Sequence, residues 1–378
     1  MTARPPGRVR RGPPVRSSLP ARPSLDPVLA LLAELRDRAR ASLRPEVWEY
    51  YEAGSGDEVT LGEAEAAWRD FRLRPRVLRD VSRVDVGSTL LGTPLASPFV
   101  VAPMAFHALA HPDGECATVR GAGDAGCLTV VSTRASRPLE DVAAAATGPW
   151  WFQAYLMRDR GLTDALAGRA AAAGAGAVVL TVDTPHVGRK RRVSGVRIEV
   201  PDDEYLVNLA RHLVPGAVGR EAAEQDPAMT PDVVARLAAA GGLPVLVKGV
   251  LRGDEAVRCV EAGAAGVVVS THGGRQLDRA LPSAHALADV VAAVGGRVPV
   301  LVDGGIRSGT DALVALALGA DAVLVGRPVL WALAAGGAAA VTAVLDELAG
   351  DLRHVLALAG APSPADLDPG TVVAHPRR

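Results

Sequence analysis

The chain has 378 residues, 49% of them hydrophobic, which is enough for one barrel-sized domain or two smaller ones. Its 41 basic and 42 acidic residues nearly cancel, so no overall positive field exists to attract nucleic acid or an anionic membrane, and we expect neither as a partner. Three cysteines without metal-ligand spacing argue against a disulfide framework and a metal site, and they fit a reducing compartment, expected here to be the cytoplasm.

The first 25 residues are rich in arginine, proline and serine and contain no acidic residue. Because they also lack the apolar core of a signal peptide, we expect residues 1–26 to be a disordered tail, with a transit peptide as the alternative. The main domain is expected over residues 27–360 and begins with a short helical extension. Within it, residues 45–53 are predicted to form a helix that places Tyr50 near its end.

From about residue 95 onward, short β-branched runs alternate with alanine- and leucine-rich stretches of helical period, which is typical of βα units and a parallel sheet. About eight such runs are present, the number that closes a (β/α)8 TIM barrel, so the predicted fold class is α/β. Residues 165–173, 256–262 and 310–318 are predicted to be outer helices, each followed by glycine. The predicted strands cover residues 99–105, 128–132, 151–155, 177–183, 244–248, 266–270, 299–303 and 322–326.

Nearly every predicted strand ends in a polar residue. In a barrel, the carboxyl ends of all strands face one rim, where the active sites of this fold lie. We therefore expect the functional site at that rim. The polar residues at or just after the strand ends are Ser132, Gln153, Tyr155, Thr181, Asp183, Lys248, His272, Asp303 and Arg327.

Three further segments are interpreted from their composition. The longest connection, about residues 188–230, is too long for a simple loop and is predicted to be a lid or a disordered segment. Its basic run, residues 189–192, is interpreted as a lid base facing an anionic substrate rather than as a nucleic-acid patch. No apolar run approaches a membrane span, since even residues 334–344 are interrupted by glycine, and residues 361–378 are expected to be a C-terminal tail.

The run of residues 121–126 matches the dinucleotide-binding fingerprint GxGxxG, with glycine at its first, third and last positions. That fingerprint must follow a strand and open a helix, because its glycines bring the backbone and the helix N-terminus close to a pyrophosphate. Here the run lies inside a predicted helix and precedes a strand. We therefore do not expect a nicotinamide dinucleotide site.

The segment His272-Gly-Gly-Arg275 places a base and an anion clamp on one loop after a buried strand. Arg275 can hold a carboxylate through two parallel donors, while His272 can take a proton from the same molecule. Asp183, at another strand end, could orient His272 and stabilise its imidazolium. A histidine beside glycine is more often an ordinary loop residue, so this inference depends on the other rim residues.

Glycines and arginines follow the last two predicted strands, at residues 303–307 and 326–328. Barrels commonly bind phosphate there through glycine N–H groups and the N-terminus of a short helix, and Arg307 and Arg327 add charge. The alternative is a pair of tight turns with solvated arginines. Lys248 ends an apolar strand and could stabilise negative charge on a cofactor ring, unless it reaches solvent from the rim.

With these motifs in this order, the chain resembles the FMN-dependent α-hydroxy-acid oxidase and dehydrogenase family, which includes lactate oxidase and glycolate oxidase. The resemblance covers about residues 28–360 and implies oxidation of an (S)-2-hydroxy acid to the 2-oxo acid by hydride transfer to flavin N5. The matching motifs are Tyr50-Tyr51 with Gly54, Ala102-Pro103-Met104-Ala105, Gln153-Ala-Tyr155, Leu180-Thr-Val-Asp-Thr-Pro185, Leu246-Val-Lys-Gly-Val250, His272-Gly-Gly-Arg-Gln-Leu-Asp278, Asp303-Gly-Gly-Ile-Arg307 and Gly326-Arg327-Pro328.

Carried over by position, the resemblance makes His272 the active-site base and Asp183 its partner, with Tyr155 near the substrate hydroxyl. The substrate carboxylate is implied to be bound by Arg275 and Lys190, assisted by Tyr50. The residues implied to hold the FMN ring are Pro103, Met104, Ala105, Ser132, Gln153, Thr181 and Lys248, and those implied at its phosphate are Asp303, Gly304, Gly305, Arg307, Gly326 and Arg327.

Three positions depart from the family pattern. Thr271 stands where the signature usually has asparagine. Lys190 replaces a usual arginine and so exchanges a bidentate clamp for a point charge. Arg134 stands where glycolate oxidase has a large aromatic residue beside the substrate. We hypothesise that Arg134 favours a substrate with a polar or anionic side chain; the alternative is a solvated arginine.

Two other functions compete with this one. A flavin barrel of the same family could oxidise a modified peptide or an amine, as is attributed to the pre-mycofactocin synthase branch, but the carboxylate clamp of Arg275 would serve no purpose there. A non-catalytic flavin-binding barrel would be expected to lack His272, Arg275 or Tyr155. Ala105, which the resemblance places near flavin N5, favours O2 over another electron acceptor. The resemblance also implies a homo-oligomer, either a tetramer or an octamer.

Overall fold

The computed structural model describes residues 26–193, 198, 200, 205, 207–209 and 221–375. Eight parallel strands form a closed barrel in which each strand pairs with its neighbour in sequence, and the last pairs with the first. This arrangement confirms the predicted (β/α)8 TIM barrel and all eight predicted strands. The strands are β4 (Phe99–Val101), β5 (Leu128–Ser132), β6 (Trp150–Ala154), β7 (Val178–Thr181), β8 (Val245–Val250), β9 (Gly266–Val269), β10 (Val300–Asp303) and β11 (Ala322–Val325).

The strands are buried on both faces, which is why they consist almost entirely of apolar residues. One face packs against the surrounding helices and the other fills the interior of the barrel. A short antiparallel hairpin, β2 (Ser88–Leu90) and β3 (Thr93–Leu95), adds Leu90 and Leu95 to the interior core. The same core contains Leu128, the first residue of β5, so the hairpin closes the end of the barrel opposite the carboxyl ends of the strands.

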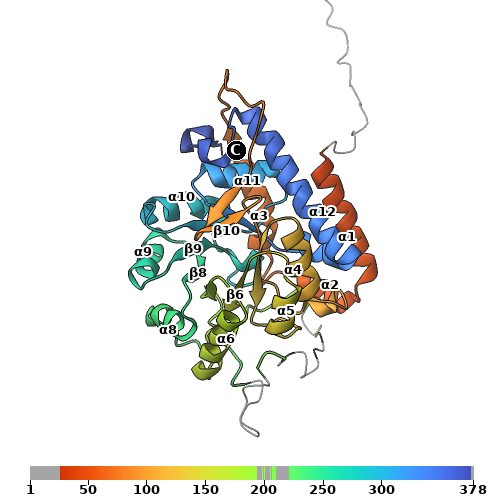
Figure 1. Ribbon diagram of the computed structural model, residues 1–378, viewed down its shortest axis with the longest axis vertical. Coiled ribbons are helices and arrows are strands. Elements are labelled where there is room, and N and C mark those ends of the chain that lie inside the picture. Colours follow the sequence, from red (N-terminus) through yellow and green to blue (C-terminus); the bar gives the residue numbers. More distant parts are fainter. Residues whose placement is uncertain are drawn as a thin grey trace, which may run out of the picture.

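Helices follow the strands and cover the outside of the barrel (Figure 1). The three helices predicted between strands are present as Arg160–Ala172, Gly253–Glu261 and Gly309–Ala317, so each begins earlier than predicted, the last by a single residue. Helix α4 contains residues 121–124 of the glycine run and ends before Gly126. A Cβ at Gly121 would lie 2.4 Å from the carbonyl oxygen of Ala338, so this glycine permits close helix packing. The helices around the barrel are α4 (Glu115–Asp124), α5 (Leu139–Ala145), α6 (Arg160–Ala172), α8 (Asp232–Gly241), α9 (Gly253–Glu261), α10 (Ser283–Val294), α11 (Gly309–Ala317) and α12 (Arg327–Ala359).

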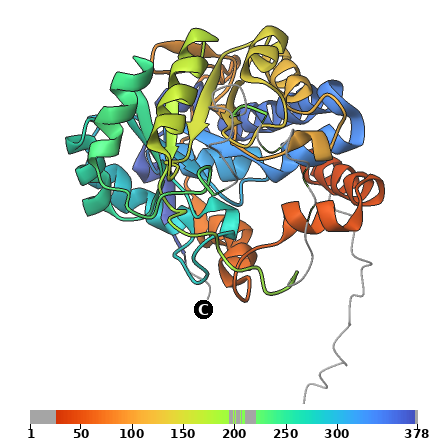
Figure 2. The same cartoon turned by 90° about the horizontal axis from the view of Figure 1, so that it is seen from below.

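The N-terminal extension consists of three helices before the barrel. Asp26 caps the first of them by accepting hydrogen bonds from the N–H groups of Val28 and Leu29. This helix packs along α12, and Figures 1 and 2 show the red N-terminal helices beside the blue C-terminal one. The elements of the extension are α1 (Pro27–Ser42), α2 (Pro45–Glu52), α3 (Val59–Ala66), the 3-10 helix η1 (Ala67–Asp70) and β1 (Phe71–Leu73).

Helix α12 contradicts the expectation that no apolar run approaches a membrane span. Over Arg327–Asp366 the chain is long and apolar enough to cross a membrane by length and composition. The glycines at 336 and 337 interrupt the helical backbone without ending the element, which is why the run was underestimated. Its apolar residues pack against α1, α4 and α11, which is the environment of a core helix in a globular domain.

The C-terminal segment is part of the fold rather than a tail. The last strand, β12 (Val372–Ala374), pairs antiparallel with β1, so residues 361–375 extend the domain beyond the expected end at residue 360. The prediction of a tail is wrong for these residues, because a short strand at a chain end carries too weak a local signal. Residues 1–25 and about half of the predicted lid, residues 194–197, 199, 201–204, 206 and 210–220, lie outside the described residues. The remaining 3-10 helices are η2 (His107–Leu109), η4 (His272–Gly274), η5 (Pro364–Asp366) and η6 (Pro369–Thr371).

Candidate active site

A cavity lies at the carboxyl ends of the barrel strands, as predicted for this fold. Every residue predicted to hold FMN lines it, together with four of the predicted catalytic or substrate-binding residues. Asp183, Lys190 and Arg134 are not among the lining residues. The predicted residues that line the cavity are Tyr50, Pro103, Met104, Ala105, Ser132, Gln153, Tyr155, Thr181, Lys248, His272, Arg275, Asp303, Gly304, Gly305, Arg307, Gly326 and Arg327.

His272 and Asp183 form a hydrogen-bonded pair, with 2.9 Å between His272 Nδ1 and Asp183 Oδ1. Burial raises the pKa of Asp183, but the charge and hydrogen bond of His272, together with the charge of Lys248, outweigh burial and hold this pKa below its ordinary value. Asp183 is therefore a carboxylate, which only accepts, so the proton of the neutral ring is on Nδ1. That leaves Nε2 of His272 as the nitrogen that can take a proton.

The backbone of His272 adopts a left-handed conformation with φ of 55°, which is uncommon for a residue with a side chain. Its N–H donates to Ser270 Oγ at 3.0 Å, and this bond helps to hold the conformation. Strained backbone of this kind clusters at functional sites, where the surrounding structure over-determines it. The turn therefore fixes the histidine ring at the cavity instead of leaving it on a mobile loop.

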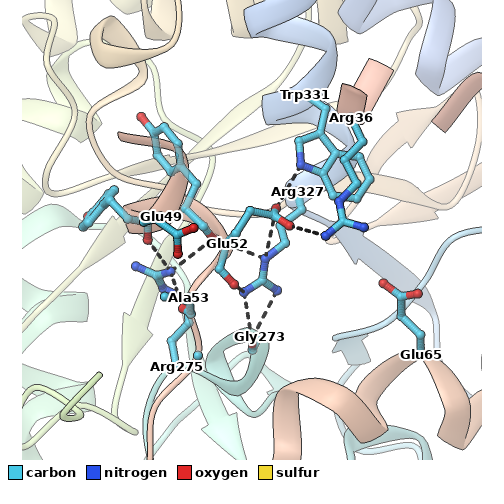
Figure 3. A network of polar contacts seen from close by, with 12 residues as sticks. Arg36, Glu49, Glu52, Ala53, Glu65, Gly273, Arg275, Arg327 and Trp331 are labelled. Atoms are coloured by element: carbon cyan, nitrogen blue, oxygen red, sulfur yellow. Dashed lines mark hydrogen bonds and ion pairs between the residues drawn. The ribbon is translucent and has the colours of Figure 1, made fainter. Parts of the chain in front are cut away.

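Arg275 reaches the C-terminal end of helix α2. Its Nη1 donates to the carbonyl oxygens of Tyr50, Tyr51 and Ala53 at 2.7, 3.2 and 3.0 Å, and Figure 3 shows the side chain directed at Ala53. These carbonyls have no partner within the helix, so Arg275 also caps it. With Nη1 engaged in this way, Nε and Nη2 are the donors of Arg275 that can face a ligand.

Lys190 is a second cation near the Tyr50 ring. Its Nζ is 6.0 Å from the centre of the Tyr50 ring, and the guanidinium carbon of Arg275 is 5.2 Å from it. Burial, and then the positive charge of Arg275, lower the pKa of Lys190 to about 8. The two cations repel each other in the ligand-free state, and a bound carboxylate would relieve that repulsion.

The hydroxyl groups of Tyr50 and Tyr155 remain protonated. Burial raises the pKa of both, and the opposing charges of Arg275 and Arg134 are smaller effects. Each tyrosine can therefore donate a hydrogen bond to a substrate oxygen at neutral pH. Both line the same cavity as His272.

The polar groups of β5, β6 and β7 are tied together at the floor of the cavity. Gln153 Nε2 donates to Thr181 Oγ1 at 3.1 Å, and Gln153 Oε1 accepts from Ser132 Oγ and the N–H of Thr133. These bonds determine which way the amide points. A row of donors and acceptors fixed in this way suits the polar edge of a flat heteroaromatic ring.

Lys248 is buried, with 3% of its surface exposed, and does not reach solvent. Its Nζ lies 2.8 Å from Asp303 Oδ2 and donates to Ser270 Oγ at 2.7 Å. The carboxylate of Asp303 therefore faces Lys248 rather than an anionic phosphate. Asp303 Oδ1 and Thr271 Oγ1 are buried without a hydrogen-bond partner, so this part of the cavity has polar groups that a ligand could satisfy.

The glycines after β10 permit a close approach of helix α3. Gly305 has φ of 80°, and a Cβ there would lie 2.0 Å from the carbonyl oxygen of Ala64. The adjacent Arg307 pairs with Glu65 at 2.9 Å, and Arg327 begins helix α12. Two arginines beside glycine N–H groups and a helix N-terminus make a site for a multiply charged anion.

Arg327 is buried to the same extent as Arg307, with 15% of its side chain exposed. Burial, and then the charge of Arg275, lower its pKa to about 10, so it remains charged at neutral pH. The buried carboxylate of Glu52 lies 3.9 Å from Arg327 Nε and accepts from Arg36 Nη2 at 2.8 Å and Trp331 Nε1 at 3.0 Å (Figure 3). Glu52 therefore orients Arg327 from the side away from the cavity.

The sequence missed Glu52 and Ser270. Ser270 ends the run of β9 and could have been found as one more polar residue after a buried strand. Glu52 had no such signal, because an acidic residue near a helix end is usually solvated. Only the packing of α2 against the start of α12 buries it.

Arg134 is buried rather than solvated, since 7% of its surface is exposed. Its Nη2 donates to the carbonyl oxygen of Ala223, and its guanidinium carbon is 4.6 Å from the centre of the Tyr205 ring. The sequence-based alternative of a solvated arginine is therefore wrong.

These features fit FMN. Gly305, Arg307 and Arg327 offer an anion site at one end of the cavity, and Gln153, Thr181 and Lys248 offer polar groups for the ring. The base His272 lies in the same cavity. In the described part of the chain, no group of three or more His, Cys, Asp or Glu side chains is placed to hold a metal ion.

Comparison with known proteins agrees with this chemistry. The model of a protein family described as FMN-dependent dehydrogenase matches residues 39–374. An L-lactate oxidase of Nostoc sp. is 45% identical over 350 residues, and the match covers 89% of this chain and 96% of the relative. A 4-hydroxymandelate oxidase of Amycolatopsis orientalis is 43% identical over 339 residues, and that match covers 88% of this chain and 95% of the relative. A crystal structure of mandelate oxidase, 42% identical, superposes with a TM-score of 0.83 over 90% of this chain and 97% of that one.

Proposed function

The chain belongs to the FMN-dependent dehydrogenase family, and we propose that it oxidises an (S)-2-hydroxy acid to the corresponding 2-oxo acid. The observation that carries this proposal is the His272–Asp183 pair, 2.9 Å apart, on the same rim as Arg275. This arrangement joins a base to a carboxylate clamp beside the cofactor site. The relatives named above are oxidases of lactate and of 4-hydroxymandelate, both of which are 2-hydroxy acids.

Each side chain of the site has a separate role in the proposed reaction. Arg275 and Lys190 bind the substrate carboxylate, and their two charges fix its orientation. Tyr155 donates a hydrogen bond to the substrate hydroxyl oxygen. His272 Nε2 removes the hydroxyl proton, and Asp183 stabilises the imidazolium that results. When bound, FMN accepts the α-hydrogen with its electron pair.

Lys248 contributes charge rather than a proton. It is buried beside the predicted ring site and is held in place by Ser270 and Asp303. A fixed cation in a water-poor cavity stabilises negative charge that develops nearby, because no solvent reorganisation is needed. The arginines at positions 307 and 327 would hold the phosphate at the other end.

The acceptor, the assembly and the location of the protein belong to the same proposal. O2 is the acceptor that fits the oxidase names of the relatives. Cys116, Cys127 and Cys259 are free thiols, which supports a cytoplasmic location, and we propose that the protein assembles as a homotetramer or homo-octamer. Light scattering on the purified protein measures the assembly state directly.

The reaction is tested by mixing the FMN-loaded protein anaerobically with lactate, glycolate and mandelate, each as separate enantiomers where they exist. We expect the S enantiomers to bleach the visible flavin band and the R enantiomers to leave it. Admission of air should then restore the colour with formation of H2O2. A band that no 2-hydroxy acid bleaches would overturn the proposal, and colour that returns only with an added dye would overturn O2 as the acceptor.

The base is tested with His272→Ala. We expect this variant to retain FMN and to bleach at least about 100-fold more slowly, because removal of a general base costs about 10² to 10⁴ in rate. The exposed His354 on α12 provides a control, and His354→Ala should bleach as the wild type does. Wild-type bleaching by His272→Ala would remove this residue from the mechanism.

A further inference from the structure

Arg134 is a buried cation without a counter-charge. Its Nη2 has a single acceptor, the Ala223 carbonyl, and its Nη1 is buried without any hydrogen-bond partner. In the part of the chain that the structure describes, no carboxylate forms an ion pair with it. A buried charge left in this state is costly, since desolvation is not repaid by an opposite charge.

Two other partly buried arginines do have carboxylate partners. Arg307, whose side chain is 15% exposed, pairs with Glu65, and Arg169, 11% exposed, pairs with Glu140 at 2.8 Å. Arg134 is more deeply buried than either. Arg307 and Arg169 are therefore neutralised by carboxylates of the protein, whereas Arg134, like Arg275, has no carboxylate partner among the described residues.

Arg134 lies on the loop after β5, directly beside a residue of the cavity lining. It lies two residues after Ser132, which lines the cavity, and its N–H donates to the Ser132 hydroxyl at 3.1 Å. Although burial raises the pKa of Tyr50 and Tyr155, the charge of Arg134 opposes that increase at both tyrosines. The guanidinium is therefore within electrostatic reach of both hydroxyl groups that face the substrate.

An aromatic surface separates Arg134 from the other cations. The Tyr50 ring, beside Arg275, has its centre 6.2 Å from that of Phe106, and Phe106 is stacked at 5.9 Å on Tyr205, beside Arg134. Two positive poles thus flank an apolar wall. A ligand that satisfies both carries two negative groups joined by a short apolar chain.

We propose that Arg134 binds a second carboxylate at the far end of the substrate, so that the preferred substrates are 2-hydroxy dicarboxylic acids. This inference rests on the proposed oxidation of 2-hydroxy acids and specifies the side chain of the substrate. Arg275 and Lys190 hold the α-carboxylate, and Nη1 of Arg134 donates to the second carboxylate. The second carboxylate thus supplies the negative charge that no described residue of the protein places beside Arg134.

The test compares (S)-malate and (S)-2-hydroxyglutarate with (S)-lactate and (S)-2-hydroxyhexanoate, using kcat/KM of the FMN-loaded enzyme. We expect the wild type to prefer at least one dicarboxylate. In Arg134→Met the ratio of dicarboxylate to monocarboxylate should fall about 10- to 100-fold, because a hydrogen bond to a charged group contributes about 1.5–3 kcal/mol. Arg134→Lys, which keeps the charge, should lose less.

Arg137→Ala is the matched control, because Arg137 lies three residues away on the same loop, is only half-buried and directs its Nη2 to the Pro112 carbonyl. It should keep the wild-type ratio. A purely structural Arg134 would slow all four substrates alike in Arg134→Met, and an unchanged ratio overturns the proposal. If lactate bleaches the flavin while neither dicarboxylate does, the second-carboxylate site is wrong and the proposed oxidation stands; if no acid bleaches it, the oxidation itself fails.

A binding measurement keeps the proposal testable if the arginine variants are poorly folded. Dissociation constants of succinate and glutarate for the oxidised wild-type enzyme, measured from the perturbation of the flavin spectrum, should be at least about tenfold lower than those of propionate and butyrate. The preference should weaken with added salt, as expected for an ion pair. Equal affinity for the two classes would contradict the second-carboxylate site without any variant.

Discussion

Lys190 holds its proton less firmly than a lysine in water. Burial and the neighbouring Arg275 lower its pKa to about 8, from 10.5 for the free side chain. We therefore expect KM for the substrate to rise as pH increases above about 8, by up to about tenfold per pH unit, because neutral Lys190 no longer attracts the carboxylate. Steady-state kinetics between pH 6.5 and 9.5 measures this dependence.

Lys190→Arg provides the control for this pH dependence. Arginine stays charged throughout the range, so KM should become nearly independent of pH up to 9.5. Between pH 8 and 10.5 the unfolded chain binds more protons at Lys190 than the folded protein does, because folding lowers the pKa of Lys190 to about 8. This group therefore makes the fold more stable as pH rises through that range. Loss of affinity over the same range is then not a result of unfolding. A KM that rises equally in both proteins would contradict the role of Lys190.

Prediction at the level of single residues succeeded where the signal was local. The rim positions of His272 and Lys248 followed from the ends of buried strands, since any polar residue there faces the same opening. The orientation of Asp303 did not, because its carboxylate could face either the phosphate or Lys248. Only the 2.8 Å contact between Asp303 Oδ2 and Lys248 Nζ shows that the carboxylate faces Lys248.

At the level of elements, the loop after β10 packs tightly against helix α3. In Gly305→Ala the new methyl group would meet the Ala64 carbonyl, so either α3 or the glycine loop must move. We expect the stability of the fold to fall by about 1–3 kcal/mol beyond the cost of the backbone conformation, and FMN to bind more weakly. Urea unfolding and fluorescence titration with FMN measure the two effects.

Gly92 separates the steric effect from the backbone effect. It has φ of 79°, almost the same as Gly305, but a Cβ there would meet nothing within 4 Å. Gly92→Ala therefore carries only the conformational cost, about 1–2 kcal/mol, and should leave FMN affinity unchanged. If the two variants lose equal stability and keep equal FMN affinity, the contact between the loop and α3 does not shape the phosphate site.

Prediction of elements was most successful for the barrel. Each strand is a short run of buried, mostly apolar residues. Each outer helix has an apolar face and a glycine near its end, so both signals are contained in a few neighbouring residues. The strands β1 and β12 were missed, because each has three residues and is stabilised by a partner at the other end of the chain. The hairpin of β2 and β3 was missed because each of its strands also has only three residues.

At the level of the whole molecule, α12 ties the N-terminal helices to the barrel. Leu348 on this helix is fully buried, whereas Leu358 is 66% exposed. We expect Leu348→Ala to lower the free energy of unfolding by about 2–5 kcal/mol and Leu358→Ala to change it by less than about 0.5 kcal/mol. Urea unfolding of the FMN-loaded protein without detergent measures both.

This pair of variants also tests the environment of α12. In a core helix, the loss of stability on Leu→Ala substitution depends on the position of the leucine, because a cavity forms only where neighbouring side chains surround the lost atoms. A helix that met lipid around its circumference would show no such contrast in lipid-free buffer. Equal effects of the two substitutions would therefore contradict the packing of α12 against α1, α4 and α11.

The sequence alone determined the barrel, the rim on which the site lies and the type of chemistry at that rim. Those properties depend on periodicity and on which residue follows each strand, and both are local. The tertiary structure decided the 2.9 Å contact between His272 and Asp183, the burial of Glu52 and the unpaired charge of Arg134. These depend on distances between residues far apart in the chain, which a pattern of neighbours does not specify.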